Sequence, residues 1–397
     1  MRKSLLIILA ICLPLLGGTF LALPDQHSTI ERTAAQVPQE ETMFDKQMFP
    51  IGIDSSSLVP DTWHVSHPEF ETLLQGWQNN NGFSGTILVA KEGQLIHTGA
   101  YGMANDQSGT PLQLNSVFQL ASVTKMFTAT AIMMLYDEKR LRFDDKLSDH
   151  IPNWPYKEIT IRHLLSHQSG LQRYDGLTRN VWNARQFMEY ADVLDLFVQK
   201  RPALNFAPGT DFDYNNSNYV ILSALVEYLA GLPFEQYLRK RIFEPLGMRQ
   251  TYFCNHLQRV EYDHHTIGYK QYRGRQRPAG GDYLDGVFGD KGLHSTILDL
   301  FKFDRALAEG RVLNPSTWIM SYEPVASSGQ GRSYGFGIRM KESWVGVGYH
   351  FGWWRGYRTA FIRDLQADET IIVLSNRDNP ARLVNFWDAY YLLNGWR

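Results

Sequence analysis

The sequence predicts an α/β fold of the α+β kind, with one antiparallel sheet flanked by helices and a mostly helical inserted region. The first observation behind this prediction is that segments with the apolar patterns of strands lie near both ends of the chain. The second is that apolar residues at helical spacing fill the middle. The N-terminal and C-terminal parts are therefore expected to build one sheet together, with helices packed on it.

The chain has 397 residues, 44% of them hydrophobic and 20% charged, which is ample for one large domain or two smaller units. The first 23 residues are expected to be a signal peptide or a membrane anchor, because Arg2 and Lys3 precede an apolar run that continues to Leu23. Residues 24–64 are polar and are interpreted as a linker, which leaves 65–397 as the domain. The domain is therefore predicted to be exported, and to be periplasmic, in the cell envelope or secreted.

The elements of the first third of the domain follow from local patterns. Residues 68–78 carry apolar side chains at helical spacing, and residues 83–101 are predicted to form a hairpin with its turn at 91–93. A further helix begins near Ser122 and is nearly apolar all round from Lys125 to Leu135. A helix without a polar face is expected to lie inside the protein.

The remaining elements are predicted in the same way. Helices are expected over residues 160–171, within 178–202, over 219–229 and 234–242, and from Ser295 onward. Strands are expected at 335–338, 344–351, 357–364 and 370–375, before a closing helix over 382–393.

Ser122 and Lys125 lie three residues apart at the start of the apolar helix, so their side chains share one face. A buried lysine is costly unless its charge is used or lost, and a neutral amine can accept the proton of a serine hydroxyl. Taken alone, the pair is better explained as a helix-capping serine and a surface lysine. The apolar helix favours the catalytic interpretation.

Two further pairs carry polar groups suited to such a site. Tyr214 and Asn216 place a phenol and an amide in a short loop, and a nearby cation such as Lys125 would lower the pKa of the phenol. His350 and Gly352 lie on one face of a predicted strand, where a glycine marks the close approach of another backbone or of a ligand. Either pair alone is more simply explained as structural.

The Ser-x-x-Lys and Tyr-x-Asn triplets occur once each, and His-x-Gly occurs at 97–99 and at 350–352. Taken with His350 and Gly352, their order resembles that of the serine β-lactamase and penicillin-binding-protein superfamily. The chain is most similar to the class C β-lactamase-related group, which includes D-alanyl-D-alanine carboxypeptidases, D-aminopeptidases and esterases. The resemblance covers roughly residues 65–395. Flanking stretches match as well: 161–171, 208–209, 245–248, 292–296 and 334–337.

The resemblance implies a role for each residue of these triplets. Ser122 would attack an amide or ester carbonyl and form an acyl-enzyme, while Lys125 and Tyr214 share proton transfer, either of them being the base. Asn216 would contact the substrate amide. The backbone N–H groups of Ser122 and of Trp353, which follows Gly352, would form the oxyanion hole.

The expected substrate is a small molecule or a peptide: a D-alanyl or other peptidoglycan-related peptide, or a β-lactam. Many β-lactamases carry lysine at the position of His350, and a histidine is only partly charged near pH 7. The sequence therefore leaves recognition of a substrate carboxylate open, with Arg355 or Arg358 as candidates for the missing cation. An esterase of the same family and a non-catalytic penicillin-binding sensor are the alternatives.

Several other classes of function are disfavoured. The net charge of −2 implies neither a nucleic-acid partner nor an anionic membrane partner, so a membrane contact is expected only through the N-terminal segment. No cofactor and no metal are expected, because His163 and His167 have helical spacing without the glutamate of a zinc helix. Removal of a signal would leave Cys254 as a single cysteine. An α/β-hydrolase is disfavoured as well.

Overall fold

A computed structural model describes residues 63–179, 181–255, 264–329, 331–379 and 384–395. The expected signal or anchor over residues 1–23 lies outside the described residues, as does all of the linker except its last two residues. Residues 48–397 form one compact unit. No helix in the described ranges is both long enough and apolar enough to cross a bilayer.

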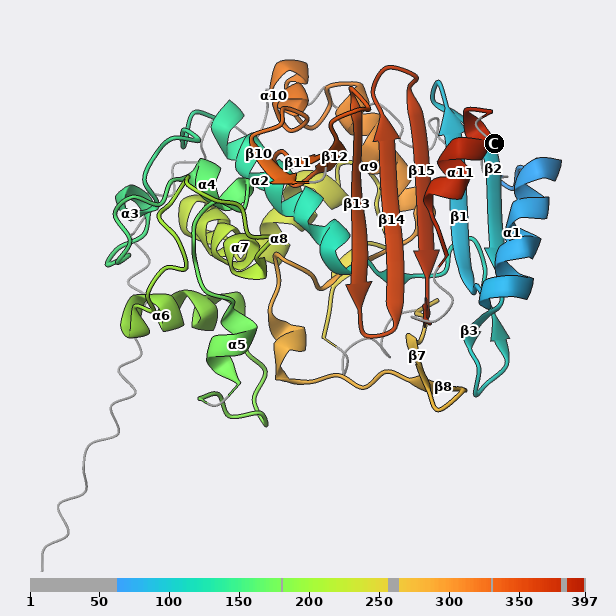
Figure 1. The fold of residues 1–397 in the computed structure, drawn as a ribbon, viewed down its shortest axis with the longest axis horizontal. Helices are drawn as coiled ribbons and strands as arrows, with labels where there is room; N and C mark the ends of the chain where they lie inside the picture. The colour runs from blue at the N-terminus through green and yellow to red at the C-terminus, as the bar shows by residue number, and fades with distance from the viewer. Residues whose placement is uncertain (1–62, 180, 256–263, 330, 380–383, 396–397) are drawn as a thin grey trace, which may run out of the picture. The chain divides into compact units, whose positions relative to one another are not determined.

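The main sheet is antiparallel and joins the two ends of the domain, as the sequence predicts (Figure 1). The N-terminal hairpin pairs with the C-terminal strands through β1 and β15, in a register that runs from Gly85 opposite Ser375 to Lys91 opposite Glu369. In spatial order the strands are β10 (Ala326–Gly329), β11 (Arg332–Tyr334), β12 (Arg339–Lys341), β13 (Val347–Trp354), β14 (Tyr357–Asp364), β15 (Glu369–Ser375), β1 (Gly85–Lys91) and β2 (Gln94–Tyr101).

Helices cover both faces of this sheet. Helices α1 (Pro68–Asn81) and α11 (Trp387–Leu393) share one hydrophobic cluster with one face of the sheet. Helices α2 (Thr124–Asp137), α9 (Ile297–Ala308) and α10 (Pro315–Met320) contribute to a second, larger cluster that includes residues of the other face. Because side chains alternate along a strand, β13 directs Tyr349 to the first cluster and His350 to the opposite side.

A mostly helical region is inserted between the N-terminal and C-terminal strands (Figure 1). Its helices are α3 (Leu147–His150), α4 (Ile161–Leu165), α5 (Tyr174–Thr178), α6 (Tyr190–Lys200), α7 (Asn216–Ala230) and α8 (Phe234–Leu238), which runs into a π-helical turn (Arg239–Phe243). Short strands complete the fold: β3 (Met103–Asn105), β4 (Thr110–Pro111), β5 (Phe118–Gln119), β6 (Tyr252–Phe253), β7 (Tyr269–Tyr272), β8 (Arg275–Pro278), β9 (Leu293–Ser295) and β16 (Arg377–Asp378).

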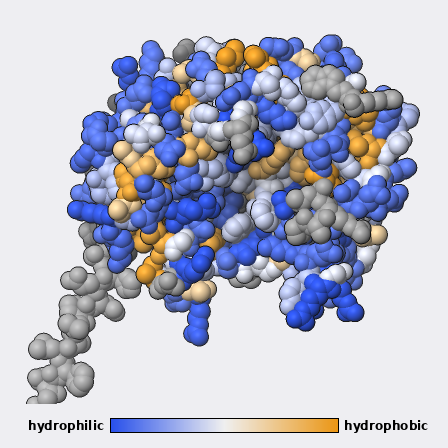
Figure 2. Space-filling view, in the orientation of Figure 1, coloured by the Kyte–Doolittle hydropathy of each residue, from blue (hydrophilic) through white to orange (hydrophobic). Residues whose placement is uncertain are grey.

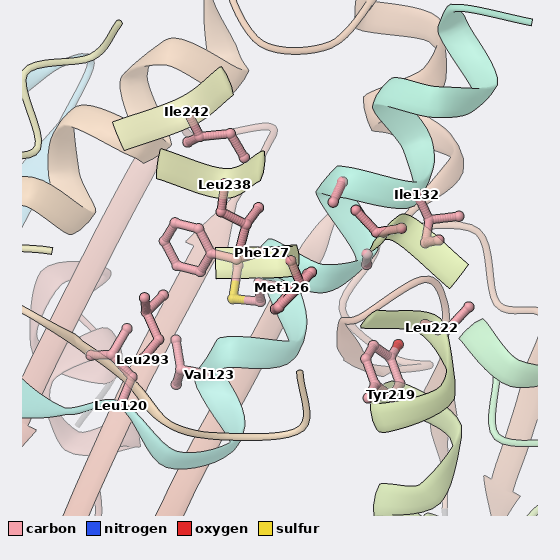
Figure 3. Close-up of a cluster of buried hydrophobic side chains, with 14 of the residues drawn as sticks. Leu120, Val123, Met126, Phe127, Ile132, Tyr219, Leu222, Leu238, Ile242 and Leu293 are labelled. Atoms are coloured by element: carbon pink, nitrogen blue, oxygen red, sulfur yellow. The ribbon is translucent and has the colours of Figure 1, made fainter. Parts of the chain in front are cut away.

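Helix α2 lies in the centre of the larger cluster. Every side chain from Thr124 to Leu135 is buried, which confirms that this helix has no solvent-exposed face. Figure 3 shows Met126 and Phe127 of α2 near Leu238 and Ile242 of the helical region, with Leu293 of β9 close to Val123. Burial on all sides fixes the direction in which the first turn of α2 points.

Two predicted helices have different bounds in the structure. The helix predicted over 160–171 ends at Leu165, because His167 adopts a left-handed conformation with φ of 61° and turns the chain toward Tyr214. The helix predicted from Tyr219 begins three residues earlier, at Asn216, because the side chain of Asn215 accepts a hydrogen bond from the Ser217 N–H at 2.9 Å. Both differences arise next to the candidate site.

Candidate active site

The turn that precedes α2 presents Ser122 at the centre of the site. Ser122 is partly exposed, whereas its neighbours Ala121 and Val123 are buried. Ala121 has φ of 50°, a left-handed conformation that costs a non-glycine residue roughly 1–2 kcal/mol. Such strain persists only where the surrounding structure enforces it, and here it accompanies the one side chain of the turn that reaches solvent.

The backbone before Ser122 is held by β13 and β14. Thr359 donates a hydrogen bond to the Leu120 carbonyl at 2.7 Å. A Cβ atom at Gly352 would overlap that carbonyl oxygen and would lie 3.0 Å from the Cβ of Ala121. The expectation that Gly352 permits a close approach is therefore confirmed, and the approaching group is the backbone that carries Ser122.

Lys125 lies one turn into the helix and is fully buried. Its Nζ donates to the Ser122 Oγ at 3.2 Å and to the main-chain carbonyl of Asp290 at 2.8 Å. The same Nζ lies 5.2 Å from the centre of the Tyr214 ring. The amine is thus aimed at the serine hydroxyl by a fixed acceptor behind it.

Tyr214 precedes α7 and faces the same point. The backbone N–H of the next residue, Asn215, bonds to Nδ1 of His167 at 3.2 Å, and the His167 ring packs 4.4 Å from the Tyr214 ring. Burial disfavours the phenolate. The positive charges of Lys125 and Arg339, with hydrogen bonds to Ser122 and Lys125, outweigh burial and hold the pKa of Tyr214 below its ordinary value.

Arg339 is a site residue that the sequence analysis does not identify. Its guanidinium carbon lies 4.1 Å from the centre of the Tyr214 ring and 5.7 Å from that of Tyr334. Arg339 opens β12, and its backbone pairs with Tyr349 of β13, next to His350. It therefore brings a permanent positive charge onto the face of the phenol.

His350 is fully buried on β13. Its Nδ1 lies 3.0 Å from the carbonyl oxygen of Phe351 and must carry the proton there, which leaves Nε2 to accept from the Tyr334 hydroxyl at 3.2 Å. Burial, followed by the charges of Arg339 and Lys125, lowers the pKa of His350 well below 6.5. The histidine is therefore neutral at pH 7, and Arg339 is the fixed cation of this part of the site.

The two candidate cations from the sequence, Arg355 and Arg358, form ion pairs within the chain. Arg355 is paired with Asp285 at 3.2 Å and with Asp282. Arg358 is paired with Asp378 at 2.9 Å. Both arginines are thus paired with carboxylates of the chain, whereas the guanidinium of Arg339 lies over the Tyr214 ring.

Asn216 and the two tryptophans after Gly352 have different surroundings. The Asn216 Oδ1 is buried and has no hydrogen-bond partner among the described residues. Trp353 is 60% exposed, and its indole N–H donates to Asp378 at 2.7 Å, on the side of β13 away from His350. Trp354 points to the other side, where its indole N–H bonds to Asp285 at 3.2 Å.

A buried polar network behind Lys125 is the second feature that the sequence analysis misses. The Lys291 Nζ donates to the Tyr174 hydroxyl at 2.7 Å and lies 3.3 Å from the Asp290 Oδ1. The Tyr174 hydroxyl in turn donates to Asp290 at 3.2 Å. Burial lowers the pKa of Lys291 despite the opposing charges of Asp290 and Asp285. The network holds Asp290 in place, and the main-chain carbonyl of Asp290 accepts the hydrogen bond from Lys125.

The two histidines with helical spacing have separate positions. His163 belongs to the N-terminal cap of α4, where its Nδ1 accepts from the Thr160 N–H at 3.2 Å. His167 packs on Tyr214, as described above. Across the described ranges, no group of three or more histidine, cysteine or acidic side chains is placed to hold a metal ion.

Comparison with known proteins shows the family of the chain. Residues 71–394 match the sequence model of the Beta-lactamase family. The chain belongs to the Beta-lactamase family. It is thus a serine hydrolase of the β-lactamase and penicillin-binding-protein superfamily, and its mixed fold is that of these proteins.

Relatives within the Beta-lactamase family carry several names. Penicillin-binding protein 4* of Bacillus subtilis (strain 168) is 32% identical over 321 residues, which is 78% of this chain and 71% of the relative. A D-aminopeptidase of Gluconobacter oxydans (strain 621H) is 26% identical over 317 residues, covering 77% of this chain but 58% of the relative. The octameric penicillin-binding protein homologue of Pyrococcus abyssi superposes with a TM-score of 0.73 at 24% identity, over 83% of this chain and 77% of that structure.

Proposed function

We propose that this protein hydrolyses an amide or ester through an acyl-enzyme on Ser122. The observation that carries the proposal is the position of the Lys125 Nζ, 3.2 Å from the Ser122 Oγ, with Tyr214 hydrogen-bonded to both side chains. A serine becomes a nucleophile when an adjacent group takes its proton, and both candidate bases lie within reach.

In the proposed reaction, Tyr214 acts as the general base and Lys125 as the proton relay. The lowered pKa of Tyr214 favours this assignment, because it raises the fraction of phenolate near neutral pH. The Ser122 Oγ attacks the carbonyl carbon as its proton passes to Tyr214. The proton then moves to the leaving amine or alcohol, the acyl-enzyme forms, and water attacks it with help from Tyr214. The N–H groups of Ser122 and Trp353 are assigned to the oxyanion.

We propose a D-alanyl or other peptidoglycan-related peptide, or a β-lactam, as the substrate. The unpartnered Oδ1 of Asn216 is a suitable acceptor for the N–H of such an amide. The names of the relatives, a penicillin-binding protein and a D-aminopeptidase, point to the same classes. Export through the N-terminal segment, which would bring the domain to the cell envelope, is part of this proposal.

The test is intact mass spectrometry of the protein after incubation with a fluorescent penicillin. Ser122→Ala removes the proposed nucleophile, and Ser108→Ala, at an exposed serine, is the matched control. A stable adduct on the parent and the control, absent from Ser122→Ala, supports a penicillin-binding peptidase. Ser122-dependent hydrolysis of the penicillin without a stable adduct supports a β-lactamase.

An esterase is the second candidate, and the neutral state of His350 favours it. A neutral histidine does not clamp a substrate carboxylate as a charged lysine does, and an ester substrate needs no carboxylate. Ser122-dependent cleavage of short-chain nitrophenyl esters, without reaction with penicillin, would select this alternative. Hydrolysis that persists in Ser122→Ala would refute the acyl-enzyme proposal. If the parent reacts with neither the penicillin nor the esters, the non-catalytic alternative stands.

A further inference from the structure

A basic β-ribbon projects from the fold outside the candidate active site. Strands β7 and β8 form a hairpin in which Lys270 pairs with Arg277 and Tyr272 with Arg275. Every residue from Lys270 to Pro278 is exposed. Hydrophilic atoms project at the lower right of Figure 2, over the position of β7 and β8 in Figure 1.

The charges of this hairpin are gathered on one face. Because side chains alternate along a strand, Lys270 and Tyr272 share a face with their cross-strand partners Arg277 and Arg275. Like charges directly opposite each other destabilise a sheet, so the pairing of Lys270 with Arg277 is a cost to the isolated fold. We call Lys270, Tyr272, Arg273, Arg275 and Arg277 the basic ribbon.

The cations of the basic ribbon are left available. None of the four forms an ion pair with a described residue, whereas neighbouring arginines are committed: Arg377 to Asp106 and Arg358 to Asp378. Tyr272 is 51% exposed, with the guanidinium carbons of Arg273 and Arg277 at 5.3 and 5.1 Å from its ring centre. An exposed aromatic ring set among cations is typical of membrane interfaces.

The ribbon is anchored firmly at its base. Tyr269 is buried, its hydroxyl accepts from the Asp106 N–H at 2.7 Å, and Arg377 stacks 4.3 Å above its ring. A Cβ atom at Gly268 would overlap the carbonyl oxygen of Arg355. The ribbon therefore starts against the turn between β13 and β14, which follows the exposed Trp353. A surface bound by the ribbon would fix the orientation of β13, the strand that carries His350.

We propose that the basic ribbon docks the protein on an anionic phospholipid surface. The ribbon projects, and none of its residues lines a described cavity, so its shape suits a flat partner better than a polymer chain that needs a groove. Its charges complement phosphate headgroups, and Tyr272 enters the interfacial layer. The net charge of −2 hides this patch because the compensating acidic residues lie elsewhere. The proposal is independent of the proposed hydrolysis.

The test measures partition onto vesicles by co-sedimentation, with phosphatidylglycerol mixed into phosphatidylcholine and with phosphatidylcholine alone. Protein beginning at Met48 is used, because residues 48–397 form one compact unit that contains every described helix and strand and lack the apolar N-terminal run. Circular dichroism and cooperative melting establish that each protein is folded. The ribbon variant replaces four cations by glutamine: Lys270, Arg273, Arg275 and Arg277.

The control variant replaces four exposed cations that also lack ion pairs with described residues: Lys157, Arg185, Lys200 and Lys240. A cation near an anionic bilayer contributes about fivefold to partition, so the loss of all four should weaken binding to the anionic vesicles roughly 600-fold. The control should bind like the parent, and added salt should release the parent.

Equal binding by the ribbon and control variants would overturn the proposal, as would equal binding of the parent to both kinds of vesicle. If the parent binds soluble inorganic polyphosphate but does not partition onto the anionic vesicles, the partner of the basic ribbon is an anionic polymer and the membrane proposal is wrong. Tyr272→Ala adds a test of the aromatic contact and should weaken vesicle binding without changing its salt dependence. Reaction with the fluorescent penicillin should be the same in all these variants.

Discussion

The guanidinium carbon of Arg339 lies 4.1 Å from the centre of the Tyr214 ring, so β12 places a permanent cation on the phenol beside Ser122. His350 lies on the adjacent strand β13, in the triplet where many β-lactamases carry a charged lysine, but it is buried and neutral. The positive field on Tyr214 therefore comes from Lys125 and Arg339 together. The cation of this site is supplied from a strand outside the three recognised triplets.

Replacing Arg339 by glutamine should raise the pKa of Tyr214, because one of the two charges that favour the phenolate is lost. In a plot of acylation rate against pH, the rise on the acidic side should therefore shift to higher pH. At pH 7 acylation should fall about tenfold, since a partly buried cation–π contact is worth roughly 1–2 kcal/mol. Stopped-flow acylation by a fluorescent penicillin from pH 5 to pH 10 measures the shift.

Arg339→Lys is the matched variant, because it keeps the charge but not the planar stacking, and should shift this rise less. An unchanged pH profile with a raised KM for a carboxylate substrate would show that Arg339 contacts the substrate instead. A uniform loss at every pH would contradict any effect through Tyr214.

Replacing Gly352 by alanine should damage the site through its backbone. The added Cβ would overlap the Leu120 carbonyl and the Thr359 hydroxyl, which are hydrogen-bonded to each other at 2.7 Å. Overpacking of this kind costs about 1–3 kcal/mol, so urea unfolding should show a lower midpoint. Acylation should fall further than stability alone requires, because Leu120 sets the turn that presents Ser122.

Gly76→Ala is the control for this substitution. Gly76 lies inside α1 with no neighbouring atom within 4 Å of an added Cβ, so alanine should stabilise the helix by roughly 0.5–1 kcal/mol. Equal effects of the two substitutions on the unfolding midpoint would argue that Gly352 is not closely packed in solution.

The sheet and the central helix are readable from the sequence for a physical reason. Strands buried on both faces are continuous apolar runs, and α2 is apolar all round because no side of it meets water. Ser122 and Lys125 are likewise adjacent by helical geometry alone. Local periodicity therefore predicts both the frame and the first pair of the site.

The rest of the site depends on contacts between distant segments. Arg339 lies in a three-residue strand with no pattern of its own, and only folding brings it over Tyr214. Asp290 and Lys291 are adjacent charges of the kind usually found on a surface, yet both are buried. The left-handed His167 ends a helix early because it packs on Tyr214. None of these contacts leaves a local signal in the sequence.

The buried pair of Asp290 and Lys291 should show strong energetic coupling. Lys291→Met leaves the buried Asp290 carboxylate without its cationic partner, although the Tyr174 hydroxyl still donates to it. Removing one partner of a buried ion pair lowers the free energy of unfolding by about 3–5 kcal/mol. Asp290→Asn should cost stability for the same reason. The double variant should lose less than the sum of the two, because no unpaired charge remains.

Urea unfolding of the four proteins closes this double-mutant cycle. Acylation measured on the same proteins reports on the main-chain carbonyl of Asp290, which accepts from Lys125 at 2.8 Å. Acylation should fall in each single variant and partly recover in the double variant. Strictly additive losses in stability would contradict a coupled pair.

Stability should fall as the pH drops below 6.5, in part because of His350. Burial keeps its pKa in the folded protein well below 6.5, so in more acidic solution the unfolded chain binds a proton that the folded chain does not. The contribution is complete above pH 6.5 and is lost at about 1.4 kcal/mol per pH unit below it. His167, also buried with a lowered pKa, adds a loss of the same sign.

His350→Gln removes one of these protons, so the free energy of unfolding between pH 6.5 and 5 should fall less steeply, by about 1.4 kcal/mol per unit. If His350→Gln keeps the parent slope in urea titrations at each pH, the histidine binds its proton equally in both states, and it does not enter the folded site as a neutral group.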